Sequence, residues 1–174
     1  MIIKATKKLL NISGIKAGKD TSATLETLPG EWYAAPISLL RPGKLAVQFL
    51  HYPTYILIVI PGKSLKKLVP LLAKKISDFL NRHGFAELES DFQLNSPTEI
   101  FSTNSRSMLA HMNQIKFDLE YHIAMSESIE EIDYNRLEDL NTDYMFGGKN
   151  KDSKYIRSID VLKRLMEVKK MASS

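Results

Sequence analysis

The chain has 174 residues, 44% of them hydrophobic and 25% charged, with a formal net charge of +4; this balance predicts one folded domain over residues 1–174 and excludes general disorder. Cysteine is absent, which excludes disulfides, thiolate metal sites and cysteine nucleophiles and suits a reducing compartment, so we expect a cytoplasmic protein. The longest apolar run, Tyr55 to Ile60, is far shorter than the roughly 20 residues of a membrane span, so we expect no membrane partner.

The N-terminal third predicts a small, mostly antiparallel sheet. Its strand candidates are short apolar runs: residues 1–5, 31–35, 45–49 and 55–60. The last two are joined by a short turn that contains Pro53, which predicts a hairpin. Because the run 55–60 has no polar face, we expect both of its sides to be covered. Between the first two strands, a short helical or turn segment ends at Gly14, and residues 17–27 form a loop.

Helices are predicted after the sheet. Apolar residues from Leu65 to His83 recur every three or four positions, which is typical of an amphipathic helix, and Gly84 stands where such a helix ends. Pro70 lies inside this pattern and removes a backbone hydrogen bond. We therefore expect either a bend at Pro70 or the start of the main helix there.

The next predicted helix, over about 105–123, carries apolar residues on two sides. One side holds a cluster that spans about 60° when each residue turns the helix by about 100°: Met108, Met112, Ile115 and Leu119. Phe117 and Ala110 lie nearly opposite this cluster. A solvated face does not normally contain such residues, so we expect this helix to be central and contacted on two sides.

Two further helices complete the predicted fold. Ser128 and Glu131 form a capping box before Ile132, which predicts a third helix. The apolar spacing over about 160–171 predicts a fourth. Strands followed by helices are typical of an α+β fold. We therefore predict that the sheet packs against about four helices.

No cofactor or metal motif is complete in the sequence. The segment from Gly14 to Thr21 superficially resembles a phosphate-binding loop, but only three residues separate Gly14 from Gly18, and Asp20 follows the lysine. A P-loop requires four residues there and Ser or Thr after the lysine, because the loop length forms the amide cradle. The four histidines show no metal-ligand spacing. We expect neither a cofactor nor a metal.

Two features of the central helix have both a structural and a functional interpretation. Ser102 or Asn104 caps the helix start, or this start receives an anion with Arg106 as its charge partner. Capping is favoured, and the two interpretations are compatible. Asp118 and His122 lie four residues apart and form either a catalytic acid–base couple or a local surface ion pair, and the ion pair is favoured.

The charge is unevenly distributed along the chain. Residues 1–84 hold 13 Lys and Arg against 4 Asp and Glu, whereas residues 85–174 hold 11 against 16. The basic half suits nucleic acid or another anionic partner through Lys7 and Lys8, although an offset of the two halves on one surface is favoured. Trp32 would stack on a base if it were exposed beside these lysines. Burial of Trp32 under the helices is the favoured alternative.

Several short motifs follow one another along the chain: Met1-Ile-Ile-Lys4, Thr6-Lys7-Lys8-Leu9, Trp32-Tyr33-Ala34, Asn104-x-Arg106-Ser107-Met108-Leu109 with Met112-Asn113, and Leu140-Asn141-Thr142. Together they resemble a widespread bacterial family of domains of unknown function. Its members open with M-I-I-[KR]-x-T-K-K-L and carry W-Y-A and N-x-R-S-x-L-x-x-M-N elements. The resemblance implies a stand-alone bacterial cytoplasmic protein and carries no activity.

Two functions from different classes fit these observations. The favoured one is a non-enzymatic binding or regulatory module whose partner is a nucleic acid or another protein. The alternative is a small hydrolase or transferase in which Arg106 clamps an anionic substrate and Asn113 orients it. That alternative requires one pocket to hold both residues together with a titratable group: Glu120, His111 or His122.

Overall fold

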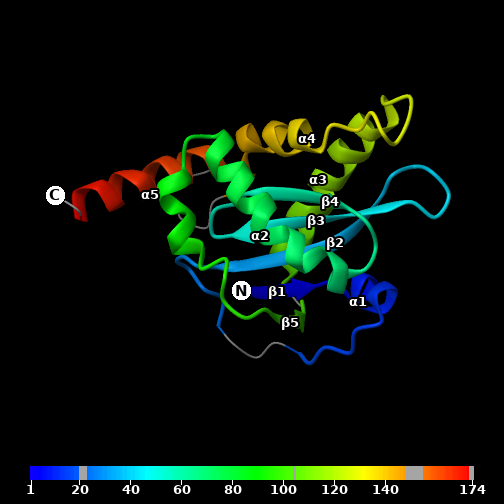
Figure 1. The fold of residues 1–174 in the computed structure, drawn as a ribbon, viewed down its shortest axis with the longest axis horizontal. Helices are drawn as coiled ribbons and strands as arrows, with labels where there is room; N and C mark the ends of the chain where they lie inside the picture. The colour runs from blue at the N-terminus through cyan, green and yellow to red at the C-terminus, as the bar shows by residue number, and fades with distance from the viewer. Residues whose placement is uncertain (20–22, 104, 148–154, 173–174) are drawn as a thin grey trace.

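The computed structural model describes residues 1–19, 23–103, 105–147 and 155–172, and a five-stranded sheet lies at its centre (Figure 1). The strands lie side by side in the order β4-β3-β2-β1-β5. Their bounds are β1 (Ile2–Ala5), β2 (Glu31–Ser38), β3 (Leu45–Tyr52), β4 (Leu57–Pro61) and β5 (Glu99–Ser102). A separate two-stranded sheet consists of β6 (Phe146–Gly147) and β7 (Tyr155–Ile156).

The main sheet is mixed, so the prediction of a mostly antiparallel sheet from the N-terminal third is only partly right. Strands β2, β3 and β4 pair antiparallel, as the predicted hairpin requires. Strand β1 instead runs parallel to both of its neighbours, β2 and β5. Parallel neighbours need a crossover connection. The segment after β1 supplies one of these crossovers, and the long helical segment before β5 leads to the other.

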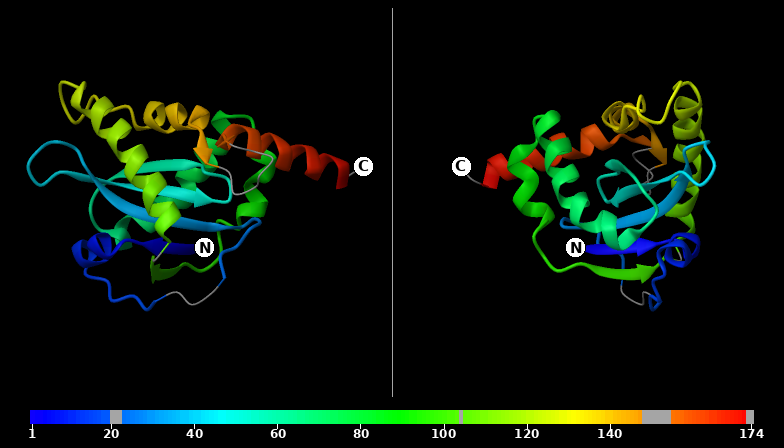
Figure 2. Two further views of the ribbon diagram at one scale, coloured as in Figure 1. Left: turned by 180° about the vertical axis from the view of Figure 1, so that it is seen from behind. Right: turned by 45° about the vertical axis from the view of Figure 1, so that its right-hand side comes forward.

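Helices cover both faces of the sheet, as Figure 2 shows. The described residues form five α-helices rather than about four, together with two short 3-10 helices: α1 (Lys7–Ser13), α2 (Leu65–Arg82), η1 (Ala86–Phe92), α3 (Arg106–Ala124), α4 (Tyr134–Leu140), η2 (Asn141–Asp143) and α5 (Ser158–Ala172). Helices α1, α2, η1 and α5 share a core with one face of the sheet. Helices α3 and α4 share a second core with the opposite face.

Strand β4 shows how the sequence builds both cores. Ile58 and Ile60 point into the core under α2, whereas Leu57 and Val59 point into the core under α3 and α4. All four are at most 3% exposed. The expectation that both sides of this strand are covered is therefore confirmed. Helix α2 runs through Pro70 without interruption.

Two predictions about the helices are wrong. Helix α3 is contacted on one side, because Phe117 is 71% exposed and Ala110 is exposed as well. Helix α4 does not use the capping box at Ser128, since its N-cap is Asp133, whose carboxylate accepts a hydrogen bond of 3.0 Å from the Arg136 backbone N–H. The chain between α3 and α4 is therefore longer than predicted.

Candidate ligand-binding pocket

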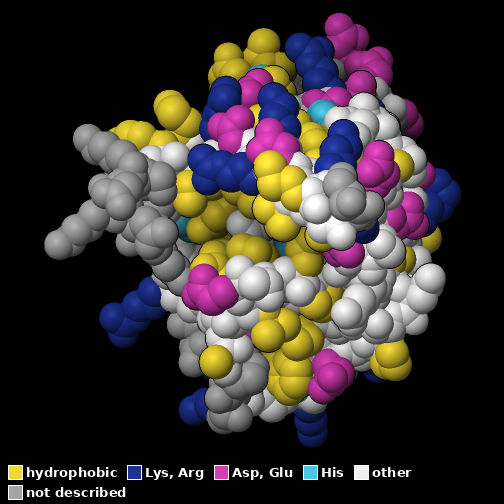
Figure 3. Space-filling model, turned by 90° about the vertical axis from the view of Figure 1, so that its left-hand side faces the viewer, with side chains coloured by type: hydrophobic (Ala, Val, Ile, Leu, Met, Phe, Trp, Pro, Cys, Tyr) yellow, Lys and Arg dark blue, Asp and Glu magenta, His cyan; other side chains and the backbone are white. Residues whose placement is uncertain are grey.

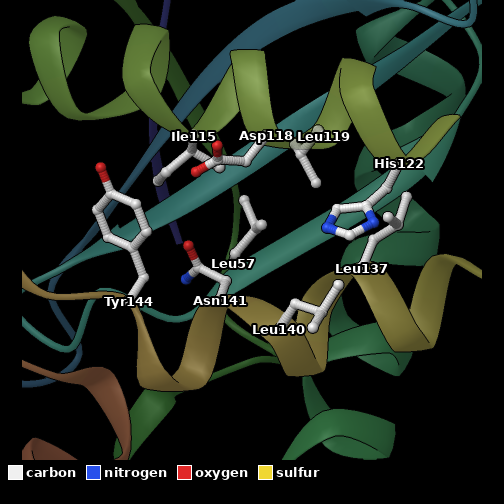
Figure 4. Close-up of a pocket in the computed structure, with 9 residues that line it drawn as sticks. All are labelled: Leu57, Ile115, Asp118, Leu119, His122, Leu137, Leu140, Asn141 and Tyr144. Carbon is white, nitrogen blue, oxygen red and sulfur yellow. The ribbon is translucent and has the colours of Figure 1, made fainter. Parts of the chain in front are cut away.

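A cavity of about 200 Å³ lies between α3 and α4 (Figure 4). Its floor is Leu57, the first residue of β4. The two helical walls carry apolar and polar side chains: Ile115, Asp118, Leu119, His122, Leu137, Leu140, Asn141 and Tyr144. A largely apolar hollow with a few convergent polar groups is the usual character of a small-molecule site.

The same spacing places the side chains on each wall. On α3, the lining residues occupy positions i, i+3, i+4 and i+7, starting from Ile115. On the other wall, the same spacing starts from Leu137 and continues from α4 through η2 to Tyr144. Residues with this spacing share one face of a helix. The two faces oppose each other across the cavity.

Asn141 supplies a buried acceptor that none of the described residues uses. Its side chain is 5% exposed, and its Nδ2 donates a hydrogen bond of 3.2 Å to the backbone carbonyl of Tyr55. That bond fixes the orientation of the amide, so Oδ1 is the free atom. Within the described residues, Oδ1 has no hydrogen-bond partner, and Figure 4 shows it turned toward α3. An unsatisfied buried acceptor costs about 1–3 kcal/mol, and a ligand that brought an N–H group to Oδ1 would remove this cost.

Asp118 brings a negative charge to the rim of the cavity. Burial of the Tyr144 phenol and the charge of Asp118 both raise the pKa of Tyr144, so at neutral pH this residue remains a phenol that donates and accepts hydrogen bonds. Asp118 is exposed, whereas His122 is half-buried. The predicted ion pair between Asp118 and His122 is not formed: no such contact lies within 4.0 Å in the described part of the chain. Both side chains line the cavity instead.

The cavity is suited to a compact group that donates N–H bonds and has an apolar part. Its acceptors include the Asp118 carboxylate and Asn141 Oδ1, beside the Tyr144 phenol, which both donates and accepts, and its walls are mostly leucine and isoleucine. A cavity of roughly 150 Å³ holds one benzene ring, so this one accepts a group of about that size. Among the described residues, no cluster of three or more His, Asp or Glu side chains could hold a metal ion.

The residues predicted to bind an anionic substrate lie elsewhere on α3. Arg106 and Asn113 are both exposed and lie seven residues apart on one outward face. Neither lines the cavity described above. Asn104 lies outside the described residues. The structure therefore brings Asp118 and His122 to the pocket and leaves Arg106 and Asn113 outside it.

The start of α3 is capped, but not by Ser102, one of the two residues that the sequence predicts as its cap. The capping residue is Ser105, whose Oγ accepts a hydrogen bond of 3.4 Å from the Met108 backbone N–H. Thr103 Oγ1 in turn accepts one of 3.3 Å from the Ser105 backbone N–H. Ser102 is not the cap, because it belongs to β5 and its hydroxyl donates to the Gly18 carbonyl.

The basic candidates divide into exposed and buried residues. Lys7 and Lys8 are exposed at the start of α1. Trp32 is 1% exposed, and its ring packs 4.7 Å from that of His51. Burial of Trp32, the favoured alternative, is therefore confirmed. Its indole ring offers no surface on which a base can stack.

Cations and anions are interleaved on the face around α5, and lysines of α2 have polar or acidic neighbours. Lys74 forms an ion pair of 2.7 Å with Asp78, and Lys75 donates to Asn135. Figure 3 shows Lys, Arg, Asp and Glu side chains intermixed on the upper part of the face around α5, with hydrophobic side chains in a hollow below them. On this face, the excess of lysine in the first half of the chain does not form a patch of one sign.

The fold and the pocket together define a class: an α+β domain with a cavity that presents hydrogen-bond acceptors between two helices. A family model described as "Domain of unknown function (DUF6933)" matches residues 2–161, and the chain belongs to this family. No curated protein and no solved structure matches the chain. None of the described helices combines the length and the apolar character that crossing a membrane requires.

Proposed function

We propose that the protein is a non-enzymatic binding module whose pocket between α3 and α4 accepts a compact group with N–H donors and an apolar part. The free Oδ1 of buried Asn141 carries this proposal. The neighbouring Asp118 adds a second acceptor and a negative charge. Among the described residues that line the pocket, there is no Ser, Thr or Lys that would act as a nucleophile. We further propose that the protein is bacterial, as the family resemblance implies, and cytoplasmic, which the absence of cysteine supports.

The alternative, a hydrolase or transferase that acts on an anionic substrate near Arg106 and Asn113, has less support. Both side chains are exposed, whereas catalytic groups usually converge in a concave site that excludes water. The pocket itself disfavours an anion, because Asp118 repels it. One sheet shared by the two cores supports our proposal that residues 1–174 form a single domain.

Three probes of the same shape test the proposed ligand chemistry: benzamidine, benzamide and benzoate. Each carries one benzene ring, and they differ in charge and in N–H donors. We expect benzamidine to bind most tightly, benzamide more weakly and benzoate least, because only the first two donate to Asn141 and only benzamidine carries a charge opposite to that of Asp118. Protein-observed two-dimensional NMR should show shifts at Asp118, His122 and Tyr144.

A pair of matched variants locates the binding. Leu140 is 48% exposed at the rim of the pocket, so Leu140→Trp should fill the entrance without disturbing the core. Val168 on α5 is 64% exposed and lies away from the pocket, so Val168→Trp is the control. Benzamidine shifts should disappear in Leu140→Trp and persist in Val168→Trp. Tightest binding by benzoate, or shifts that Leu140→Trp leaves unchanged, would refute the proposal.

A further inference from the structure

A second hollow adjoins the pocket between α3 and α4. This second hollow has a volume of about 180 Å³ and shares His122, Leu137 and Leu140 with the first. Its remaining lining residues come from the end of α3, the connecting segment and the start of α4: Met125, Ser126, Glu131, Ile132, Asp133 and Arg136. The two hollows share these three lining residues and so adjoin each other along α3 and α4; together they are called the groove.

The length of this groove matches a short extended peptide. Its lining on α3 runs from Ile115 to Met125, which corresponds to a rise of about 15 Å along a helix. An extended chain advances about 3.3 Å per residue, so about five residues span the groove. A single small molecule of the size that fits the pocket would leave the half around Met125 unoccupied.

Charge and polarity indicate the chemistry of that peptide. The groove is lined by Asp118, Glu131 and Asp133 against one cation, Arg136. Met125 and Leu140 are 71% and 48% exposed, so both halves also offer apolar surface. Acidic groups beside exposed apolar side chains complement a segment that is both basic and apolar.

Resting on the proposed function, we propose that the groove binds an extended, basic and apolar peptide segment of a partner protein. An arginine enters the pocket, where its guanidinium donates to the Asp118 carboxylate and to Asn141 Oδ1. A planar guanidinium carries five N–H donors and suits this pair of acceptors better than the point charge of a lysine. An apolar side chain two residues along the strand faces the same way and contacts Met125.

The test uses the peptide acetyl-Ala-Arg-Ala-Leu-Ala-amide, the same peptide in reversed order, and the form with citrulline in place of arginine. Citrulline keeps the shape of arginine and removes its charge. We expect one of the two arginine peptides to shift NMR signals in both halves of the groove, at Tyr144 and at Glu131. Benzamidine should shift only the half around Tyr144. The citrulline peptide should bind about tenfold more weakly, as the loss of a charge-assisted hydrogen bond implies.

Two surface variants separate the groove from general electrostatics. Asp118→Asn removes one charge from an exposed groove residue and should weaken the arginine peptide about tenfold. Glu130→Gln removes one charge from an exposed neighbour that does not line the groove, and should change the affinity by less than about twofold. Equal losses in the two variants would overturn the peptide assignment.

The outcomes distinguish this inference from the proposed function. If benzamidine shifts the pocket signals and neither peptide shifts those around Glu131, the pocket stands and the peptide groove is refuted. If neither probe shifts any groove signal, both proposals fail. If a labelled RNA oligonucleotide shifts the groove signals more strongly than the arginine peptides, the partner is a nucleic acid and the inference is wrong.

Discussion

Acidification should destabilise the protein through His51, which is fully buried between two aromatic rings. The ring centroids of Trp32 and Phe92 lie 4.7 Å and 5.0 Å from that of His51. The Pro29 carbonyl, 2.9 Å from Nε2, only accepts hydrogen bonds, so Nε2 carries the proton and donates to it. Nδ1 lies 2.7 Å from the Thr54 hydroxyl and accepts from it. The folded protein therefore holds His51 neutral.

Burial lowers the pKa of His51 from 6.5 to about 4. Below pH 6.5 the unfolded chain binds a proton that the folded protein rejects, so stability is complete above this pH and falls as the pH drops toward 4. From these two pKa values, linkage predicts a loss of about 1.4 kcal/mol at pH 5.5 and about 2.5 kcal/mol at pH 4.5. Below the folded pKa the loss approaches a constant value.

Urea unfolding at pH 7.5, 5.5 and 4.5 measures this loss, with His51→Gln as the comparison. Glutamine retains an N–H donor for the Pro29 carbonyl and does not titrate. The variant should be less stable at pH 7.5, but its free energy of unfolding should fall less with pH than that of the native chain, by about 2.5 kcal/mol at pH 4.5. Other titrating groups contribute equally to both proteins. Parallel pH profiles would refute the assignment of a neutral, buried imidazole.

Three further predictions concern stability and association. Lys4→Met should lower the free energy of unfolding in urea by about 3–5 kcal/mol, because the buried Glu31 carboxylate loses its cation. Glu31 is 0% exposed and lies 2.8 Å from Lys4 Nζ. A loss below about 1 kcal/mol would contradict this. Gly30→Ala should destabilise much more than Gly14→Ala, since both have positive φ but only at Gly30 would a Cβ overlap a neighbouring carbonyl and imidazole. Phe117→Ser should change stability by less than about 0.5 kcal/mol, because this ring is 71% exposed. Light scattering should show less self-association in this variant than in the native chain, and equal self-association would contradict a role for the exposed ring.

Local patterns predicted most elements of the fold because their signals lie within one element. The alternation in β3 and the uninterrupted apolar run of β4 depend on neighbouring residues only. Local patterns do not predict strand β5, because its four residues pair with β1 almost one hundred positions earlier in the chain, as Ile2 with Glu99 shows. Nothing in a four-residue segment specifies such a distant parallel neighbour. For the same reason the sheet was predicted to be mostly antiparallel.

The sequence predicts only some of the polar residues that line the pocket. Asp118 and His122 were identified as a pair, but the choice between an ion pair and another role depends on what faces them. Asn141 and Tyr144 are not among the predicted site residues, although their spacing from Leu137 repeats that of the α3 wall. Phe117 gives a wrong prediction of burial, because an apolar residue on an exposed face has the same sequence signal as a buried one.

The position of α4 determines whether this pocket exists before a ligand arrives. The side chain of Glu138 on α4 is buried, accepts a hydrogen bond of 3.0 Å from the Val59 backbone N–H, and pairs with Arg82 at 3.1 Å. Asp139 accepts from the same Arg82 and lies 2.8 Å from His83 Nε2. These contacts fix α4 to β4 and to the end of α2 on one side, so its remaining face is directed toward α3. A wall held in this way loses little conformational freedom on binding, which favours a preformed site over one that the ligand must assemble.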